Sequence, residues 1–107
     1  MALISEKTIQ EAAQRLVHKF SPKKIILFGS QARRKADKRS DVDLLVICPI
    51  RGSRRNLKVA MDRALRGVGF ARDIIVMTPE EFDRDRHIPG TIARPASLEG
   101  RIIYEAH

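Results

Sequence analysis

The chain has 107 residues, of which 43% are hydrophobic and 32% are charged, and its formal net charge is +8 at pH 7. Its apolar residues come in short periodic runs, which excludes a disordered chain and predicts one domain over residues 1–107. No run approaches the roughly 20 apolar residues of a membrane span, so we expect a cytoplasmic protein without a membrane partner. Cys48 is the only cysteine, which excludes an internal disulfide and indicates a small buried side chain.

The first elements in chain order are a helix and a buried strand. Ser5 can cap a helix whose apolar residues recur at three- and four-residue spacing up to Phe20, and Ser21-Pro22 ends it. Lys24–Phe28 is short, rich in β-branched residues and followed by glycine. This pattern predicts a strand that is buried on both faces.

A turn and a second strand follow. Gly29-Ser30 is expected to form the turn, residues 31–36 a short helix, and residues 37–40 a polar connection. Asp41–Ile47 then has the alternation of a second strand, which Pro49 closes.

The second half of the chain predicts two more strands and two helices. Ser53 can cap a helix with a one-sided apolar stripe, Phe70–Met77 indicates a third strand, and Thr78 with the following proline starts another helix. After Asp85 we expect a loop with one or two helical turns and a final strand at Arg101–Tyr104. This alternation predicts an α/β (α+β) fold, with a small mixed β-sheet of about four strands flanked by helices.

The strand starts carry acidic residues. Residues two apart on a strand share a face, so Asp41 and Asp43 should project side by side. Such a pair is costly unless a cation neutralises it, and Mg²⁺ is the hard cation that carboxylates and phosphates prefer. Asp73 opens the third strand, so all three acids meet at one end of the sheet if the strands are neighbours. Three acids can hold two metal ions, an arrangement suited to phosphoryl transfer.

The turn before these acids supplies a complementary feature. Gly29 lets the backbone approach a ligand closely, and the amides at the start of the next helix can bind a phosphate with the Ser30 hydroxyl. Arg33 lies one turn further on and can reach the same phosphates. Residues 31–39 and 51–66 are both strongly basic, a pattern typical of solvated helix faces unless a neighbouring site gives it a role.

Gly29-Ser30, residues 31–40 and Asp41-Val42-Asp43 together resemble the signature of the nucleotidyltransferase superfamily typified by DNA polymerase β. The short chain is similar to the minimal nucleotidyltransferases of bacteria and archaea, and the resemblance covers about Lys23 to Tyr104. It implies a nucleotidyltransferase-like fold. It also implies that Asp41 and Asp43 are the metal-binding pair and Asp73 the third catalytic carboxylate and metal ligand.

The resemblance extends to the nucleotide-binding residues. It implies that Gly29 and Ser30 hold the terminal phosphates, and Ser40 matches a serine that often precedes the acids. The chain departs from the family at Arg34, where a glycine is common. The arginine either narrows the entrance or adds a phosphate contact.

These features predict the transfer of a nucleoside monophosphate to an acceptor hydroxyl with release of pyrophosphate. The resemblance favours AMP from ATP, with two Mg²⁺ ions, and it implies a small all-helical HEPN-type protein as a toxin–antitoxin partner and acceptor. The alternative is an antitoxin subunit that pairs with such a protein and binds nucleotide with little or no catalysis. Nucleic-acid binding by the basic segments is a weaker alternative, because the few aromatic residues sit where a core needs them. The acceptor, the base preference and the oligomeric state stay open.

Overall fold

A computed structural model describes residues 4–29 and 42–106 of the chain. The described elements, in chain order, are α1 (Glu6–Phe20), β1 (Lys24–Phe28), β2 (Val42–Ile47), α2 (Arg54–Ala64), β3 (Arg72–Met77), α3 (Pro79–Asp85), α4 (Ala93–Glu99) and β4 (Arg101–Glu105). The strands form one sheet in the order β3-β2-β1-β4, in which β1 is antiparallel to both β2 and β4 while β2 is parallel to β3. This mixed sheet with helices confirms the predicted fold class.

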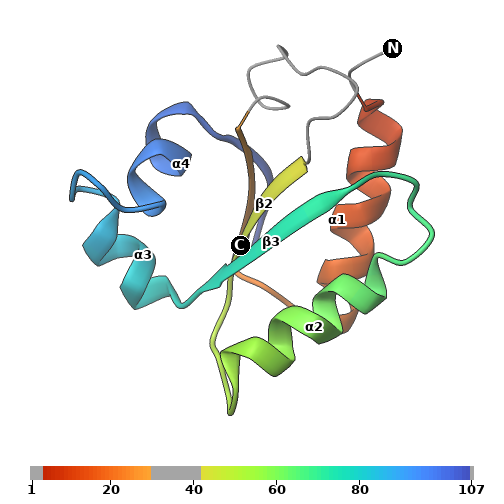
Figure 1. The fold of residues 1–107 in the computed structure, drawn as a ribbon, viewed down its shortest axis with the longest axis horizontal. Coiled ribbons are helices and arrows are strands. Elements are labelled where there is room, and N and C mark those ends of the chain that lie inside the picture. Colours follow the sequence, from red (N-terminus) through yellow and green to blue (C-terminus); the bar gives the residue numbers. More distant parts are fainter. Residues whose placement is uncertain (1–3, 30–41, 107) are drawn as a thin grey trace.

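The sheet lies between two pairs of helices. In Figure 1, α1 and α2 cover one face and α3 and α4 cover the other. Each face has its own apolar cluster, and β2 contributes to both: Leu44 and Val46 join the α1–α2 cluster, whereas Leu45 and Ile47 join the α3–α4 cluster. Because residues two apart on a strand share a face, Asp43 belongs to the α3–α4 side.

The helix starts follow the polar residues that precede them. Ser5 accepts a hydrogen bond from the Thr8 backbone, and Ser53 accepts one from the Asn56 backbone. Thr78 and Glu81 form a reciprocal capping box around the start of α3. The three capped helix starts predicted within the described residues are therefore confirmed.

Two element boundaries differ from the expectation. The third strand begins at Arg72 rather than Phe70, because the Phe70 side chain packs against the edge of the α1–α2 cluster instead of extending the ladder. The last strand ends at Glu105 rather than Tyr104, and residues 93–99 form a helix of about two turns, as expected for the segment before it. Pro95 is compatible with it because it lies in the first turn, where its missing N–H would have no partner in the helix.

Other composition-based expectations concern Cys48 and the membrane. Cys48 is buried in the α1–α2 cluster, and this burial raises the pKa of its thiol. Within residues 4–29 and 42–106, every helix is too short or too polar to span a bilayer. The predicted helix over 31–36 and the connection over 37–40 lie outside the described residues.

Candidate active site

The parallel pairing of β2 and β3 brings two of the predicted acids together. Asp43 and Asp73 are direct partners in the register of these strands, near the start of each. Neighbouring strands lie roughly 4.8 Å apart, and partners in register point to the same face, so the two carboxylates are adjacent. The condition set by the sequence for the acids to meet, that their strands are neighbours, is therefore met by β2 and β3. Asp41 lies outside the described residues.

Gly29 lies directly against the Asp43 carboxylate. Phe28, the last residue of β1, is the register partner of Asp43, so the chain leaves β1 beside the acid. Gly29 has a φ of +81°, and a Cβ added there would collide with Oδ2 of Asp43. Two independent constraints therefore require glycine: a left-handed backbone and the close approach of a carboxylate.

The acids differ in exposure. Asp43 is half-buried, whereas the Asp73 side chain is 55% exposed on the outermost strand of the described sheet. Lys58 of α2 places its Nζ 3.7 Å from Oδ1 of Asp73, a loose and solvent-exposed ion pair. Such a pair contributes little to folding and offsets the charge of Asp73, but it leaves the exposed carboxylate accessible to a ligand.

Asp43 and Asp73 offer oxygen ligands of the kind that a divalent cation takes. Two carboxylates on one face of neighbouring strands fit Mg²⁺, which commonly binds one or two carboxylates together with substrate phosphates. Across residues 4–29 and 42–106, no group of three or more His, Cys, Asp or Glu side chains gathers as a metal site. The predicted third ligand, Asp41, falls in the segment that is not described.

The structure thus brings Gly29, Asp43 and Asp73 to one end of the sheet, on three consecutive strands. The other predicted site residues lie outside the described part of the chain: Ser30, Arg33, Ser40 and Asp41. Their roles, like the roles of the three acids, stay predictions.

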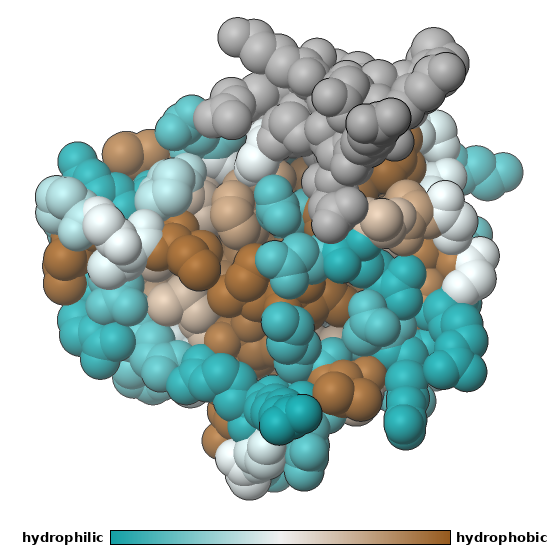
Figure 2. All heavy atoms as spheres, in the orientation of Figure 1, coloured by the Kyte–Doolittle hydropathy of each residue, from teal (hydrophilic) through white to brown (hydrophobic). Residues whose placement is uncertain are grey.

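A groove beside Asp73 was not predicted. It runs between α2 and the edge of β3 that has no neighbouring strand in the described sheet, has a volume of about 490 Å³, and is called the α2–β3 groove below. The residues that line it are Arg55, Lys58, Val59, Asp62, Arg63, Arg66, Arg72, Asp73 and Ile74. Figure 2 shows hydrophilic side chains gathered over α2, next to the apolar centre of the sheet. The basic stretch over 51–66 was a signal in the sequence, but its position beside β3 depends on tertiary packing.

A family model described as "Nucleotidyltransferase domain" matches residues 9–98. The chain belongs to the nucleotidyltransferase domain family. The matched region includes all four helices in whole or in part together with β1, β2 and β3. Family and fold support a transferase that moves nucleotidyl groups.

The fold is also similar to a crystal structure described as "a putative nucleotidyltransferase from Sulfolobus solfataricus", with a TM-score of 0.63. The two proteins are 22% identical, and the match covers 92% of this chain and 78% of the other. At that identity the likeness shows the fold alone. A search of curated proteins found no match.

Proposed function

We propose that this protein transfers AMP from ATP to a hydroxyl group of a partner protein and releases pyrophosphate. The observation that carries the proposal is the register of Asp43 with Asp73 beside Gly29, within a nucleotidyltransferase domain. Adjacent carboxylates repel each other, and a bound cation would relieve that repulsion.

In the proposed reaction, the acceptor oxygen attacks the α-phosphorus of ATP. The bond from that phosphorus to the oxygen bridging the α and β phosphates breaks, and pyrophosphate leaves. Asp73 takes the proton of the acceptor hydroxyl, because its exposed carboxylate can reach a group that approaches from solvent.

The remaining site residues position the nucleotide. Asp41 and Asp43, with Asp73, hold divalent metal, which we propose to be two Mg²⁺ ions. When bound, these ions supply positive charge for the triphosphate. Gly29 and Ser30 present backbone amides and a hydroxyl to the terminal phosphates, while Arg33 pairs with the same oxygens and Ser40 supports the acids. The work of the chain is then mainly orientation and charge stabilisation.

The acceptor is proposed to lie on another chain. All four helices of the described residues pack against the sheet (Figure 1), so none of them forms a separate lobe over the acids. We propose a small all-helical HEPN-type protein as acceptor and toxin–antitoxin partner, on the basis of the resemblance to minimal nucleotidyltransferases. The same feature favours a second candidate function, a subunit that binds this partner and nucleotide without catalysis.

Radiolabel transfer from [α-³²P]ATP tests the proposal. Wild-type protein, Mg²⁺ and a HEPN-type protein encoded beside it are expected to yield labelled partner and free pyrophosphate. Asp41→Ala and Asp43→Ala should each reduce labelling by about a thousandfold or more while the circular dichroism spectrum is unchanged. Glu80→Ala is the matched control, because Glu80 is an exposed acid of α3 outside the site, and it should label normally.

Two results would contradict the enzyme assignment. Normal labelling by Asp41→Ala would show that AMP transfer does not require the proposed metal-binding acid. Tight ATP and partner binding by the wild type, without any label transferred, would favour the binding subunit.

A further inference from the structure

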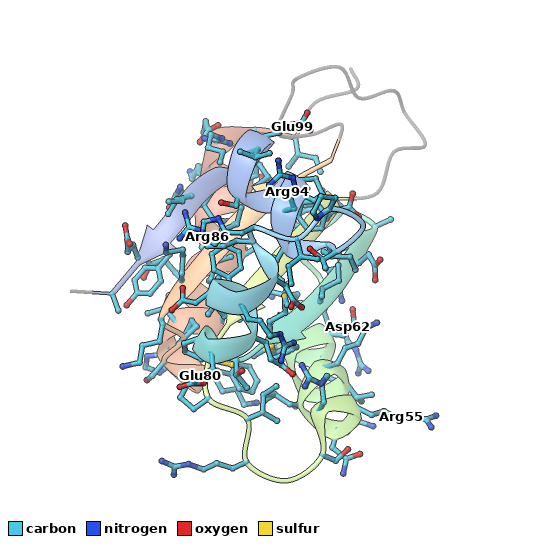
Figure 3. All side chains as sticks on the ribbon, turned by 90° about the vertical axis from the view of Figure 1, so that its left-hand side faces the viewer. Arg55, Asp62, Glu80, Arg86, Arg94 and Glu99 are labelled. Atoms are coloured by element: carbon cyan, nitrogen blue, oxygen red, sulfur yellow. The ribbon has the colours of Figure 1, made fainter. Side chains whose placement is uncertain are left out.

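The α2–β3 groove carries an excess of positive charge. Its lining has five bases against two acids, and the acids are already engaged: Asp62 pairs with Arg72 at 3.0 Å and Asp73 with Lys58 at 3.7 Å. The remaining bases, Arg55, Arg63 and Arg66, are exposed and form no salt bridge with another described residue. Figure 3 shows Arg55 and Asp62 along α2, at the side of the molecule where β3 lies. The groove therefore suits an anionic occupant.

The second wall of the groove is the outer edge of β3. Within the described sheet, β3 pairs only with β2, and the carbonyls of Ala71 and Met77 accept hydrogen bonds from the β2 side. Backbone groups of successive strand residues alternate between the two edges, so the even-numbered residues face outward. The carbonyl of Val76 confirms this alternation, since it accepts a hydrogen bond from Arg54 at 2.8 Å.

Arg72 and Ile74 are left with outward N–H and C=O groups. Arg72 and Ile74 flank Asp73 along β3, and all three residues line the groove. A strand edge of this kind can accept the backbone of an extended peptide, which gains affinity from main-chain hydrogen bonds. A peptide bound there would run past the Asp73 carboxylate.

The lining chemistry favours a polypeptide over a nucleic acid. Val59, which is 44% exposed, and the side of Ile74 give the groove an apolar floor. No aromatic side chain is among the lining residues, so unpaired bases would have no stacking surface within the described groove. An apolar floor with a basic rim and a free strand edge matches an extended segment in which apolar and acidic residues alternate.

We propose that the α2–β3 groove binds an acidic, extended segment of the acceptor protein, which adds as a strand to the outer edge of β3. The inference rests on the proposed function for its meaning, because the groove delivers the segment to Asp73. The proposal specifies the acceptor as a hydroxyl-bearing side chain within or next to an acidic stretch. It also places the approach of that side chain along the outer edge of β3.

Binding of a designed probe tests this without any transfer reaction. The probe is a fluorescein-labelled peptide of alternating Glu and Val, about eight residues long to match a short strand. Fluorescence anisotropy with the full-length chain is expected to show binding that weakens with added salt. Arg63→Glu/Arg66→Glu should weaken binding about tenfold or more, since two rim charges are reversed.

The matched control is Lys7→Glu/Lys19→Glu, which changes the net charge equally at exposed positions of α1 outside the groove. It should bind within about twofold of the wild type if the effect is local rather than due to net charge. Thermal melts of both variants check that the fold is retained.

Amide hydrogen exchange by NMR tests strand addition itself. The probe should slow exchange at the outward amides of Arg72 and Ile74 and leave Asp73 and Ile75 unchanged, because those amides already face β2. Equal affinity for a Lys-Val peptide, unchanged binding by Arg63→Glu/Arg66→Glu, or protection elsewhere would overturn the proposal. Tighter binding of oligo(dT) of equal charge, without protection of Arg72 and Ile74, would also overturn it in favour of nucleic acid.

Failure of this inference can be separated from failure of the proposed function. Asp73→Asn should abolish transfer yet bind the probe at least as well as the wild type, because it removes a negative charge from the groove. If the probe binds with the expected protection but wild-type protein transfers no AMP, the proposed enzymatic function is rejected and peptide binding in the groove is retained. Transfer without probe binding would reject the groove and leave the enzyme.

Discussion

Glu81 and Asp73 lie near opposite ends of β3, and they differ in the number and strength of their polar contacts. Glu81 accepts two hydrogen bonds from Arg54, at 2.7 and 2.8 Å, and a third from the Thr78 backbone in the capping box. The bonds from Arg54, followed by the one from the backbone, lower the pKa of Glu81 to about 2. Asp73 has one exposed lysine at 3.7 Å and an acid, Asp43, as its register partner.

This contrast separates an acid that stabilises the fold from Asp73, the acid that we propose to serve a ligand. The bonds of Glu81 tie α2, α3 and the end of β3 together, so its charge is used within the structure. Like charges directly opposite each other on neighbouring strands are destabilising. Asp43 and Asp73 have that arrangement, and the exposed Lys58 offsets it only weakly at Asp73.

The largest expected effect comes from exchanging the two kinds of acid for their amides. Asp73→Asn should reduce AMP transfer by about a thousandfold or more, and its free energy of unfolding should be unchanged or raised by up to about 1 kcal/mol. Glu81→Gln should transfer AMP normally and be destabilised. Radiolabel transfer and urea unfolding of both variants measure this. A destabilised Asp73→Asn variant with full activity would show that Asp73 serves the fold rather than the reaction.

The next effect concerns the approach of Gly29 to Asp43. Gly29→Ala should cost about 2–4 kcal/mol of stability, because it adds a steric collision to the strain of a left-handed alanine. Displacement of the Asp43 carboxylate should also lower transfer about a hundredfold. Thermal melts and the transfer assay check both.

Gly52→Ala is the matched control for that variant. Gly52 has nearly the same φ, +79°, and a Cβ there would meet no atom within 4 Å. It should lose only about 1 kcal/mol and keep full activity. Equal losses in the two variants would show that Asp43 does not press against Gly29.

The smallest effect is the pH dependence due to Glu81. Its pKa in the folded protein, about 2, lies below its ordinary value, so its stabilisation is complete above pH 5 and is lost as pH falls toward 2. The free energy of unfolding of the wild type should exceed that of Glu81→Gln by about 1 kcal/mol at pH 7, allowing for solvent screening, and by less at pH 3. Urea unfolding at both pH values measures the difference. A difference that is the same at both pH values would show that the ion pair with Arg54 is not its cause.

Local sequence signals predicted much of the fold. The bounds of β1, the cap residues of α1, α2 and α3, and the position of the last strand all follow from short patterns of apolar, polar and glycine residues. The position of Asp43 and Asp73 near strand starts indicated that they could meet, and the pairing of β2 with β3 supplied the condition that the sequence left open.

Contacts between distant elements were beyond the reach of such patterns. Arg54 and Glu81 each fit an ordinary helix start, and only the packing of α2 beside α3 shows that they pair. The same is true of Lys58 with Asp73 and of the α2–β3 groove, because the sequence does not state which strand lies at the edge of the sheet.

The partnership of Phe28 with Asp43 in the β1–β2 ladder has a consequence for protein engineering. Both ends of the segment that joins these strands are fixed by the ladder, so the glycine and the acid meet whatever the length of the segment between them. Lengthening such a connection costs only about 0.6 kcal/mol for each doubling. Residues can therefore be inserted into this segment without rebuilding the scaffold, provided that the proposed site residues Ser30, Arg33, Ser40 and Asp41 are kept.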